Sequence, residues 1–141
     1  MLIRRRAADR RAAVAVELAV LLPMLMFFAV IGVDYARVFS RTLILETASR
    51  NACYYAAQDS TKAVDTAGIT AVAQKDLTDV SDTTTVTSST YLGDDGFTHV
   101  QVTVSMTFNT ITDFPGVPYQ SNLSRTTDMR VCPTTPKAGT F

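Results

Sequence analysis

The sequence contains few of the residues that build catalytic and metal sites. It has no tryptophan, one histidine, His99, and two cysteines, Cys53 and Cys132. Two cysteines and a histidine remote from both in sequence do not complete a four-ligand zinc site. The sequence also lacks a Gly-rich phosphate loop and a nucleophile elbow. We therefore expect no enzymatic activity, no cofactor and no metal.

A calcium site is the one metal alternative, because five aspartates lie between residues 76 and 95. Their spacing matches no calcium-binding loop, and aspartates are common in solvated turns. We interpret all five as polar turn residues: Asp76, Asp79, Asp82, Asp94 and Asp95.

The formal charge is zero in total but unevenly distributed. The first eleven residues carry five arginines and one aspartate, a net charge of +4, whereas the chain from Asp34 onward has eleven acidic and eight basic residues, a net charge of −3. A nucleic-acid-binding protein would carry its positive charge on a folded face. The pattern therefore argues against a nucleic-acid partner and is typical of a membrane orientation.

A hydrophobic run covers Ala12–Val33. As a helix its 22 residues would span about 33 Å, against roughly 30 Å for the hydrocarbon core of a bilayer. The preceding arginines predict a cytoplasmic N-terminus and an extracytoplasmic remainder. A cleaved secretory signal peptide ending near Gly32 is the alternative. Against it, Leu18–Val33 is uncharged throughout, at or beyond the usual length of a signal-peptide core, and helical periodicity continues beyond it.

Glu17 is the acidic residue within this run. A carboxylate costs about 2–3 kcal/mol near the middle of a membrane, so it is a candidate functional residue. The alternative is that Glu17 reaches back to the cytoplasmic headgroups beside the arginines. The run by itself leaves both interpretations open.

The stretch from Arg10 to Pro23, RRAAVAVELAVLLP, resembles the N-terminal signature of TadE-like proteins, which are pseudopilins of the tight-adherence (Tad/Flp) pilus systems. In that family a basic leader ends in a small residue, and the mature chain has Glu at position five and Pro near position eleven. A cut between Ala12 and Ala13 puts Glu17 and Pro23 at those positions. The sequence Asp34-Tyr35-Ala36-Arg37 also resembles the family. Two departures are Ala12, where Gly is usual, and Leu18, where Phe or Tyr is usual.

The resemblance implies processing and assembly partners. Prepilin peptidase would remove the leader and expose an ammonium group on Ala13. Glu17 of one helix could then pair with that ammonium on a neighbouring pilin subunit, which would offset the cost of burying the carboxylate. The implied partners are the membrane, the peptidase, other pilin or pseudopilin subunits and the Tad inner-membrane assembly machinery, with Glu17 and Pro23 as assembly residues.

Beyond the run, residues 34–58 contain neither Gly nor Pro and have apolar positions at steps of three and four. We expect the helix to continue here, with a kink at Pro23. A ridge of small residues permits close approach either of the chain's own sheet or of another subunit. The ridge is Ala48, Ala52 and Ala56.

The remainder predicts a small α+β head. Strict alternation over His99–Phe108 indicates a half-buried antiparallel strand, with His99 on its polar face. Weaker strands are expected at Thr85–Tyr91 and Leu123–Val131, joined to the rest by a hairpin turn at Gly93–Gly96, polar turns at 79–85 and a loop at 115–118. Before the strands we expect a break and a new helix cap at Asp59–Thr61, followed by a short helix at Thr66–Lys75. The fold class is thus a long pilin-like helix, half transmembrane, followed by a small antiparallel sheet and one short extra helix.

The domain boundaries follow: a cytoplasmic leader at 1–12, a transmembrane helix at 13–33, its extracytoplasmic continuation at 34–58 and the head at 59–141. Outside the cytoplasm a disulfide is permitted, and we expect Cys53 and Cys132 to form one that ties the tail to the helix, with free thiols as the alternative. The leading hypothesis is a minor pilin or pseudopilin in the inner membrane or the extracellular pilus, concerned with pilus assembly and adhesion. The alternatives are an uncleaved, membrane-anchored binding or envelope protein and a secreted soluble protein.

Overall fold

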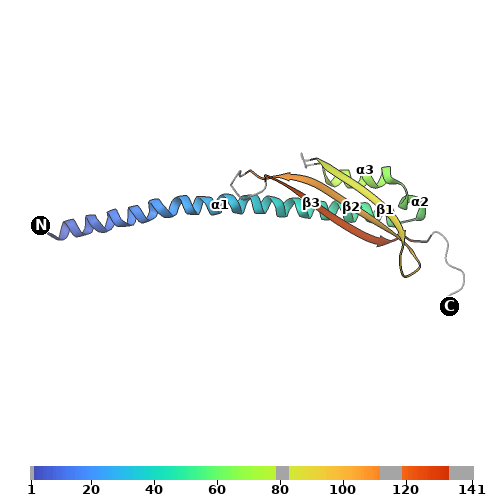
Figure 1. Cartoon of the computed structure of the whole chain (residues 1–141), viewed down its shortest axis with the longest axis horizontal. Coiled ribbons are helices and arrows are strands. Elements are labelled where there is room, and N and C mark those ends of the chain that lie inside the picture. Colours follow the sequence, from blue (N-terminus) through green and yellow to red (C-terminus); the bar gives the residue numbers. More distant parts are fainter. Residues whose placement is uncertain (1, 79–82, 112–118, 134–141) are drawn as a thin grey trace. The chain divides into compact units, whose positions relative to one another are not determined.

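The computed structural model describes residues 2–78, 83–111 and 119–133, with side chains described from Arg11 onward. The chain forms two compact units, Met1–Arg37 and Val38–Phe141. The first helix, α1 (Leu2–Ala57), begins in the first unit and ends in the second. The second unit adds α2 (Ser60–Ala63), α3 (Thr66–Asp76), β1 (Thr84–Leu92), β2 (Thr98–Asn109) and β3 (Gln120–Arg130) (Figure 1). The predicted α+β class is therefore confirmed.

The sheet is antiparallel, in the order β1-β2-β3. The alternation read from the sequence of β2 is confirmed, because the apolar side chains of this strand are buried and its polar ones lie on the other face. The strand β3 begins three residues earlier than predicted and ends one residue earlier. The buried β2 residues are Val100, Val102, Val104, Met106 and Phe108.

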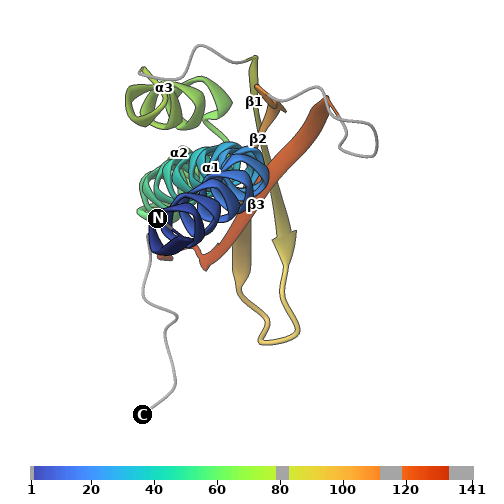
Figure 2. The same cartoon turned by 90° about the vertical axis from the view of Figure 1, so that its left-hand side faces the viewer.

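Both α1 and α3 cover the same face of the sheet (Figure 2). The three alanines of the ridge are fully buried, in one core cluster with the β2 valines. Small side chains allow the helix backbone to approach the sheet closely, so the interpretation that the ridge packs on the chain's own sheet is confirmed. The apolar face predicted for this part of α1 is buried only in part: Leu45 is in the core, whereas Phe39 is 60% exposed.

Aspartates begin both short helices. The Asp59 side chain accepts hydrogen bonds from the backbone N–H groups of Thr61 and Lys62, which confirms the predicted new cap and starts the single turn of α2. Asp65 accepts the N–H of Gly68 at 3.0 Å and so caps α3, the predicted extra helix. Side-chain caps satisfy N–H groups that have no partner within the helix. The chain thereby reverses direction, and α3 packs on the sheet.

The turn that joins β1 and β2 lies at the predicted residues. The Gly93 N–H donates to the Phe97 carbonyl at 2.8 Å, and the Gly96 N–H donates to the Gly93 carbonyl at 2.9 Å. Gly96 has a φ of 74°, a backbone conformation that glycine adopts without steric cost. The expected loop at 115–118 lies outside the described residues, as does most of the expected turn region at 79–85.

The predicted disulfide is absent: Cys53 and Cys132 are free thiols in this structure. Cys53 is buried in the core, where its Sγ lies 3.4 Å from the Val100 carbonyl oxygen and 3.5 Å from that of Thr127. Cys132 is exposed beyond the end of β3, and its backbone N–H donates to the Ala57 carbonyl at 2.8 Å. A backbone hydrogen bond thus joins the tail to α1 where we expected a covalent bond. Desolvation by burial raises the pKa of the Cys53 thiol to about 11.

Candidate functional site

The candidate assembly segment is the part of α1 in the first unit. Every side chain from Arg11 to Val33 is exposed, including large apolar ones such as Val20, at 70%, and Leu25, at 64%. Within the described residues, α1 is the one helix that is long and apolar enough to cross a membrane. A continuous exposed apolar surface of this length needs an apolar environment, which lipid or neighbouring helices can supply.

Charged residues resume where the apolar run ends. Asp34 and Arg37 lie one helical turn apart, with 3.5 Å between Asp34 Oδ1 and Arg37 Nη1. These two residues belong to the short stretch that resembles the family in the sequence. An ion pair of this kind contributes little to stability, but it marks the polar end of the candidate span.

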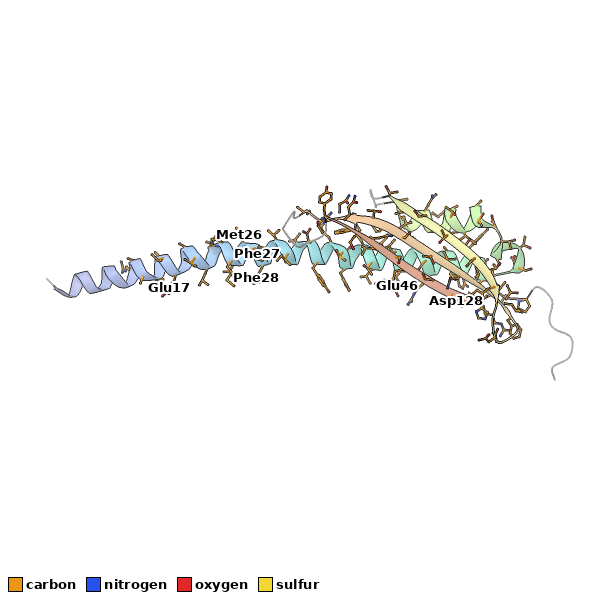
Figure 3. The ribbon with its side chains drawn as sticks, viewed as in Figure 1. Glu17, Met26, Phe27, Phe28, Glu46 and Asp128 are labelled. Atoms are coloured by element: carbon orange, nitrogen blue, oxygen red, sulfur yellow. The ribbon has the colours of Figure 1, made fainter. Side chains whose placement is uncertain are left out.

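Glu17 is exposed on α1 among apolar neighbours (Figure 3). Among the described side chains, which exclude those of residues 1–10, no cation lies within ion-pair distance of it. Ala13 and Glu17 are four residues apart, so they lie on the same face of the helix. Cα–Cβ bonds in a helix tilt towards its N-terminus, so the Glu17 side chain leaves the backbone on the side of the turn that contains Ala13.

The remaining predicted site residues on α1 are also exposed. Ala12 and Ala13, which flank the predicted cut, are both helical. Pro23 lies inside α1, which continues through it without interruption. Ala12 and Ala13, the residues of the predicted cut, and Glu17 therefore lie on adjacent turns, with Pro23 farther along the same helix.

A second polar cluster, not foreseen from the sequence, surrounds His99 at the hairpin end of the sheet. His99 is on the polar face, as predicted, but its ring lies between two carboxylates: Nδ1 is 2.9 Å from Asp128 Oδ1 and Nε2 is 3.2 Å from Asp95 Oδ2. The Tyr91 hydroxyl donates to the other Asp128 oxygen at 2.6 Å. Bonds to Asp128 and then to Asp95 raise the pKa of His99. We call these residues the His99 cluster: Tyr91, Asp95, His99 and Asp128.

Strand register explains why sequence reasoning missed the cluster. His99 is opposite Tyr91 on one side and Arg130 on the other. Alternation alone fixes which face a side chain occupies, but not which residue of the next strand lies beside it. The correct registers of β2 with β1 and of β2 with β3 were the missing information. Within the described parts of the chain, no group of three or more His, Cys, Asp or Glu is arranged to hold a metal ion.

Among the described residues, one helix is long and apolar enough to cross a membrane, and the sheet and short helices of the second unit complete an α+β fold. The family model of TadE-like proteins matches residues 12–53, from the residue before the predicted cut to the buried cysteine. The match shows that the N-terminal helix is similar to that of TadE-like proteins, which is consistent with a TadE-like protein of the Tad pilus system. Searches of curated proteins and of solved structures found no match.

Proposed function

We propose that this chain is a minor pilin or pseudopilin that enters the cytoplasmic (inner) membrane and takes part in assembly of a Tad/Flp pilus and in adhesion. One observation carries the proposal: residues 12–33, within the family match, form an exposed apolar helix surface with one carboxylate, that of Glu17. A soluble domain would expose this apolar surface to water, which is unfavourable. A subunit that is stored in a bilayer and later packed among other helices requires one.

The segments have distinct roles in this proposal. Residues 1–12 are the basic leader in the cytoplasm, 13–33 cross the membrane, 34–58 continue the helix outside it, and 59–141 form the extracytoplasmic head. The five arginines before the span favour this orientation because basic residues are retained on the cytoplasmic side. After assembly the head would be displayed on the extracellular pilus.

Prepilin peptidase would cut between Ala12 and Ala13, and Glu17 would then acquire a counter-ion. An isolated carboxylate costs about 2–3 kcal/mol near the middle of a membrane, and less near an end. The new ammonium on Ala13 of a neighbouring subunit can offset this cost, because paired charges are far cheaper to bury than single ones. The requirement for pairing would set the register of one helix against the next.

Pro23 would contribute by local bending. It has no N–H to donate to the carbonyl four residues earlier, so the helix loses one internal hydrogen bond there. A helix weakened at one turn can adjust its direction as it leaves the bilayer and packs among neighbours. This role is separate from that of Glu17, which acts through charge.

Determining the N-terminus of the mature protein tests processing directly. The protein, purified from the membranes of a host with the matching pilus system, is expected to begin at Ala13. Ala12→Gly should be processed at least as completely, because Gly is usual before the cut, whereas Ala12→Leu should block cleavage.

Other N-termini would contradict the proposal. An intact Met1 in every cell fraction would mean an uncleaved, anchored binding or envelope protein, an alternative that the alanine before the cut favours. A start near Val33 would mean a secreted protein released by signal peptidase.

Substitutions of Glu17 test assembly apart from processing. Glu17→Ala and Glu17→Gln both remove the charge, and Gln keeps the size and polarity. We expect both variants to be cut normally but to be lost from sheared surface filaments, as measured by blotting. Val20→Ala, one turn away on α1, is the matched control and should assemble. Wild-type incorporation of Glu17→Ala would refute the counter-ion mechanism.

A further inference from the structure

The His99 cluster contains more acceptors than a neutral imidazole can serve. The Phe97 N–H and then the His99 ring lower the pKa of Asp95, and the Tyr91 hydroxyl and then the His99 ring lower that of Asp128. Both carboxyl groups are therefore ionised near neutral pH and can only accept hydrogen bonds. A neutral imidazole has one N–H and a protonated one has two. Both contacts of His99 can be hydrogen bonds only while its ring is protonated.

The ring is held between these partners by close packing. Tyr91 of β1 stacks on it, with 5.5 Å between ring centroids and 30° between ring planes. Gly93 leaves the space that the ring needs: a Cβ at that position would lie 2.8 Å from His99 Cδ2. The ring thus lies against both β1 and the turn.

The charges around His99 come from three directions. The turn contributes Asp95, and β3 contributes Asp128 together with Arg130, whose backbone is opposite His99 in the register. The Arg130 guanidinium lies over the Phe97 ring, 3.2 Å from its centroid. The strand β1 contributes the Tyr91 hydroxyl, and the charge of nearby Asp94 helps to raise the pKa of Tyr91. Loss of the imidazolium charge would leave two carboxylates with Arg130 as the cation beside them.

We propose that His99 makes a pH-dependent contact between the β1–β2 turn and β3. When its ring is protonated, His99 holds the turn to β3, and when the ring is neutral it releases the turn. The Asp128 contact would persist in the neutral state, because it is the shorter of the two and Tyr91 holds that carboxylate in place. Asp95 would then face a ring nitrogen without a hydrogen and turn away. The turn of residues 93–97 therefore loosens, while the pairing of β2 with β3 remains.

The direction of the pH dependence follows from linkage. The folded-state pKa of His99 is raised above the ordinary value of 6.5. A raised pKa means that the bond stabilises the protein fully below the unfolded-state pKa and is lost as pH rises through the folded-state value. The turn is thus held to β3 by His99 at mildly acidic pH and released at alkaline pH. If the head lies outside the cytoplasm, as proposed above, the turn responds to external pH.

The chain has only one histidine, so its titration can be followed without assignment. Full-length protein labelled with ¹⁵N at histidine, in detergent micelles, should titrate with a midpoint above 6.5. Both ring nitrogens should be protonated below the midpoint, and Nδ1 should carry the hydrogen above it. Amide exchange at Gly93 and Phe97 should accelerate above the midpoint, beyond the ordinary effect of hydroxide on exchange seen at Thr103 in the middle of β2.

Variants assign the effect to the two carboxylates. Asp128→Asn and Asp95→Asn should each shift the midpoint towards 6.5, and Asp95→Asn should remove the step in turn exchange. Asp94→Asn, next to Asp95 and not bonded to His99, is the matched control and should leave the step in place. A wild-type midpoint at or below 6.5, or turn exchange that shows no step, would overturn the proposal. This titration does not depend on leader cleavage or pilus incorporation, so its result is independent of the proposed function.

Discussion

The two units place identical residue types in opposite environments. Val20 in the first unit is 70% exposed, whereas Val102 in the second is fully buried. The second unit supplies a sheet, a second helix and small alanines that together enclose the valines of β2. The first unit supplies a single helix, which cannot enclose its own apolar side chains. The difference shows that apolar residues do not determine a core by themselves, and that the first unit must find its apolar environment outside the chain.

The largest change in stability is expected when a phenylalanine of each unit is replaced by alanine and the two variants are compared. Phe108 is 1% exposed and Phe28 is 55% exposed. Phe108→Ala should lower the free energy of unfolding of the second unit by about 3–5 kcal/mol, because it removes buried area and leaves a cavity. Phe28→Ala should leave that free energy unchanged.

The buried thiol provides the measurement. In a Cys132→Ser background, Cys53 reacts with a maleimide only when the core opens, because it is fully buried and its pKa is raised to about 11. The urea concentration at which Cys53 becomes labelled in full-length protein in micelles then reports unfolding of the second unit. Equal shifts for Phe108→Ala and Phe28→Ala would mean that the units are not separate in stability.

A smaller effect is expected from enlarging a residue of the alanine ridge. Ala52→Leu adds side-chain volume where the helix meets the sheet and should destabilise the second unit by about 1–3 kcal/mol through overpacking. Thr47→Leu, an exposed position on the same helix, serves as the control and should change stability little. The same thiol assay distinguishes them. If Ala52→Leu were neutral, the close approach of helix and sheet would not depend on small side chains.

These residues also show how much of the fold the sequence could predict. The alternation of β2 and the four-residue spacing of the alanines each fix one face of one element, and both were confirmed. Local chemistry likewise predicted the Asp59 cap and the hairpin turn at Gly93–Gly96. Such features depend on residues close together in the sequence, so a single chain contains the information.

Contacts between distant residues were predicted less well. The disulfide was inferred because both cysteines follow the span, but a shared compartment does not bring two thiols within bonding distance. The His99 cluster was missed because it depends on the registers of two strand pairs. Of the candidate assembly site, the sequence could give the positions of Ala12, Ala13 and Glu17 on one helix, but a partner for Glu17 lies on another molecule in our proposal.

The smallest expected effect comes from two glycines that differ only in their surroundings. A Cβ on Gly32 in the first unit would meet nothing within 4 Å, whereas one on Gly68 would lie 2.6 Å from the Tyr55 hydroxyl and also against the Asp65 carboxylate. Alanine in place of glycine favours a helix by about 1 kcal/mol where space allows. Gly68→Ala would instead displace Asp65, which caps α3 and accepts the Tyr55 hydroxyl at 3.0 Å. Losing a cap and a hydrogen bond costs about 1 kcal/mol each, so steric displacement outweighs helix propensity.

We therefore expect Gly68→Ala to destabilise the second unit by about 1 kcal/mol in the thiol assay, and Gly32→Ala to leave it unaffected. Tyr55→Phe should reduce the penalty of Gly68→Ala when the two are combined, because Asp65 is then free to move away from the new methyl group. A double-mutant cycle measures this coupling. Strict additivity would show that the glycine is not required by the Tyr55–Asp65 pair. In that case the contact of Gly68 with the Tyr55 hydroxyl and the Asp65 carboxylate would not explain why glycine occupies this position of α3.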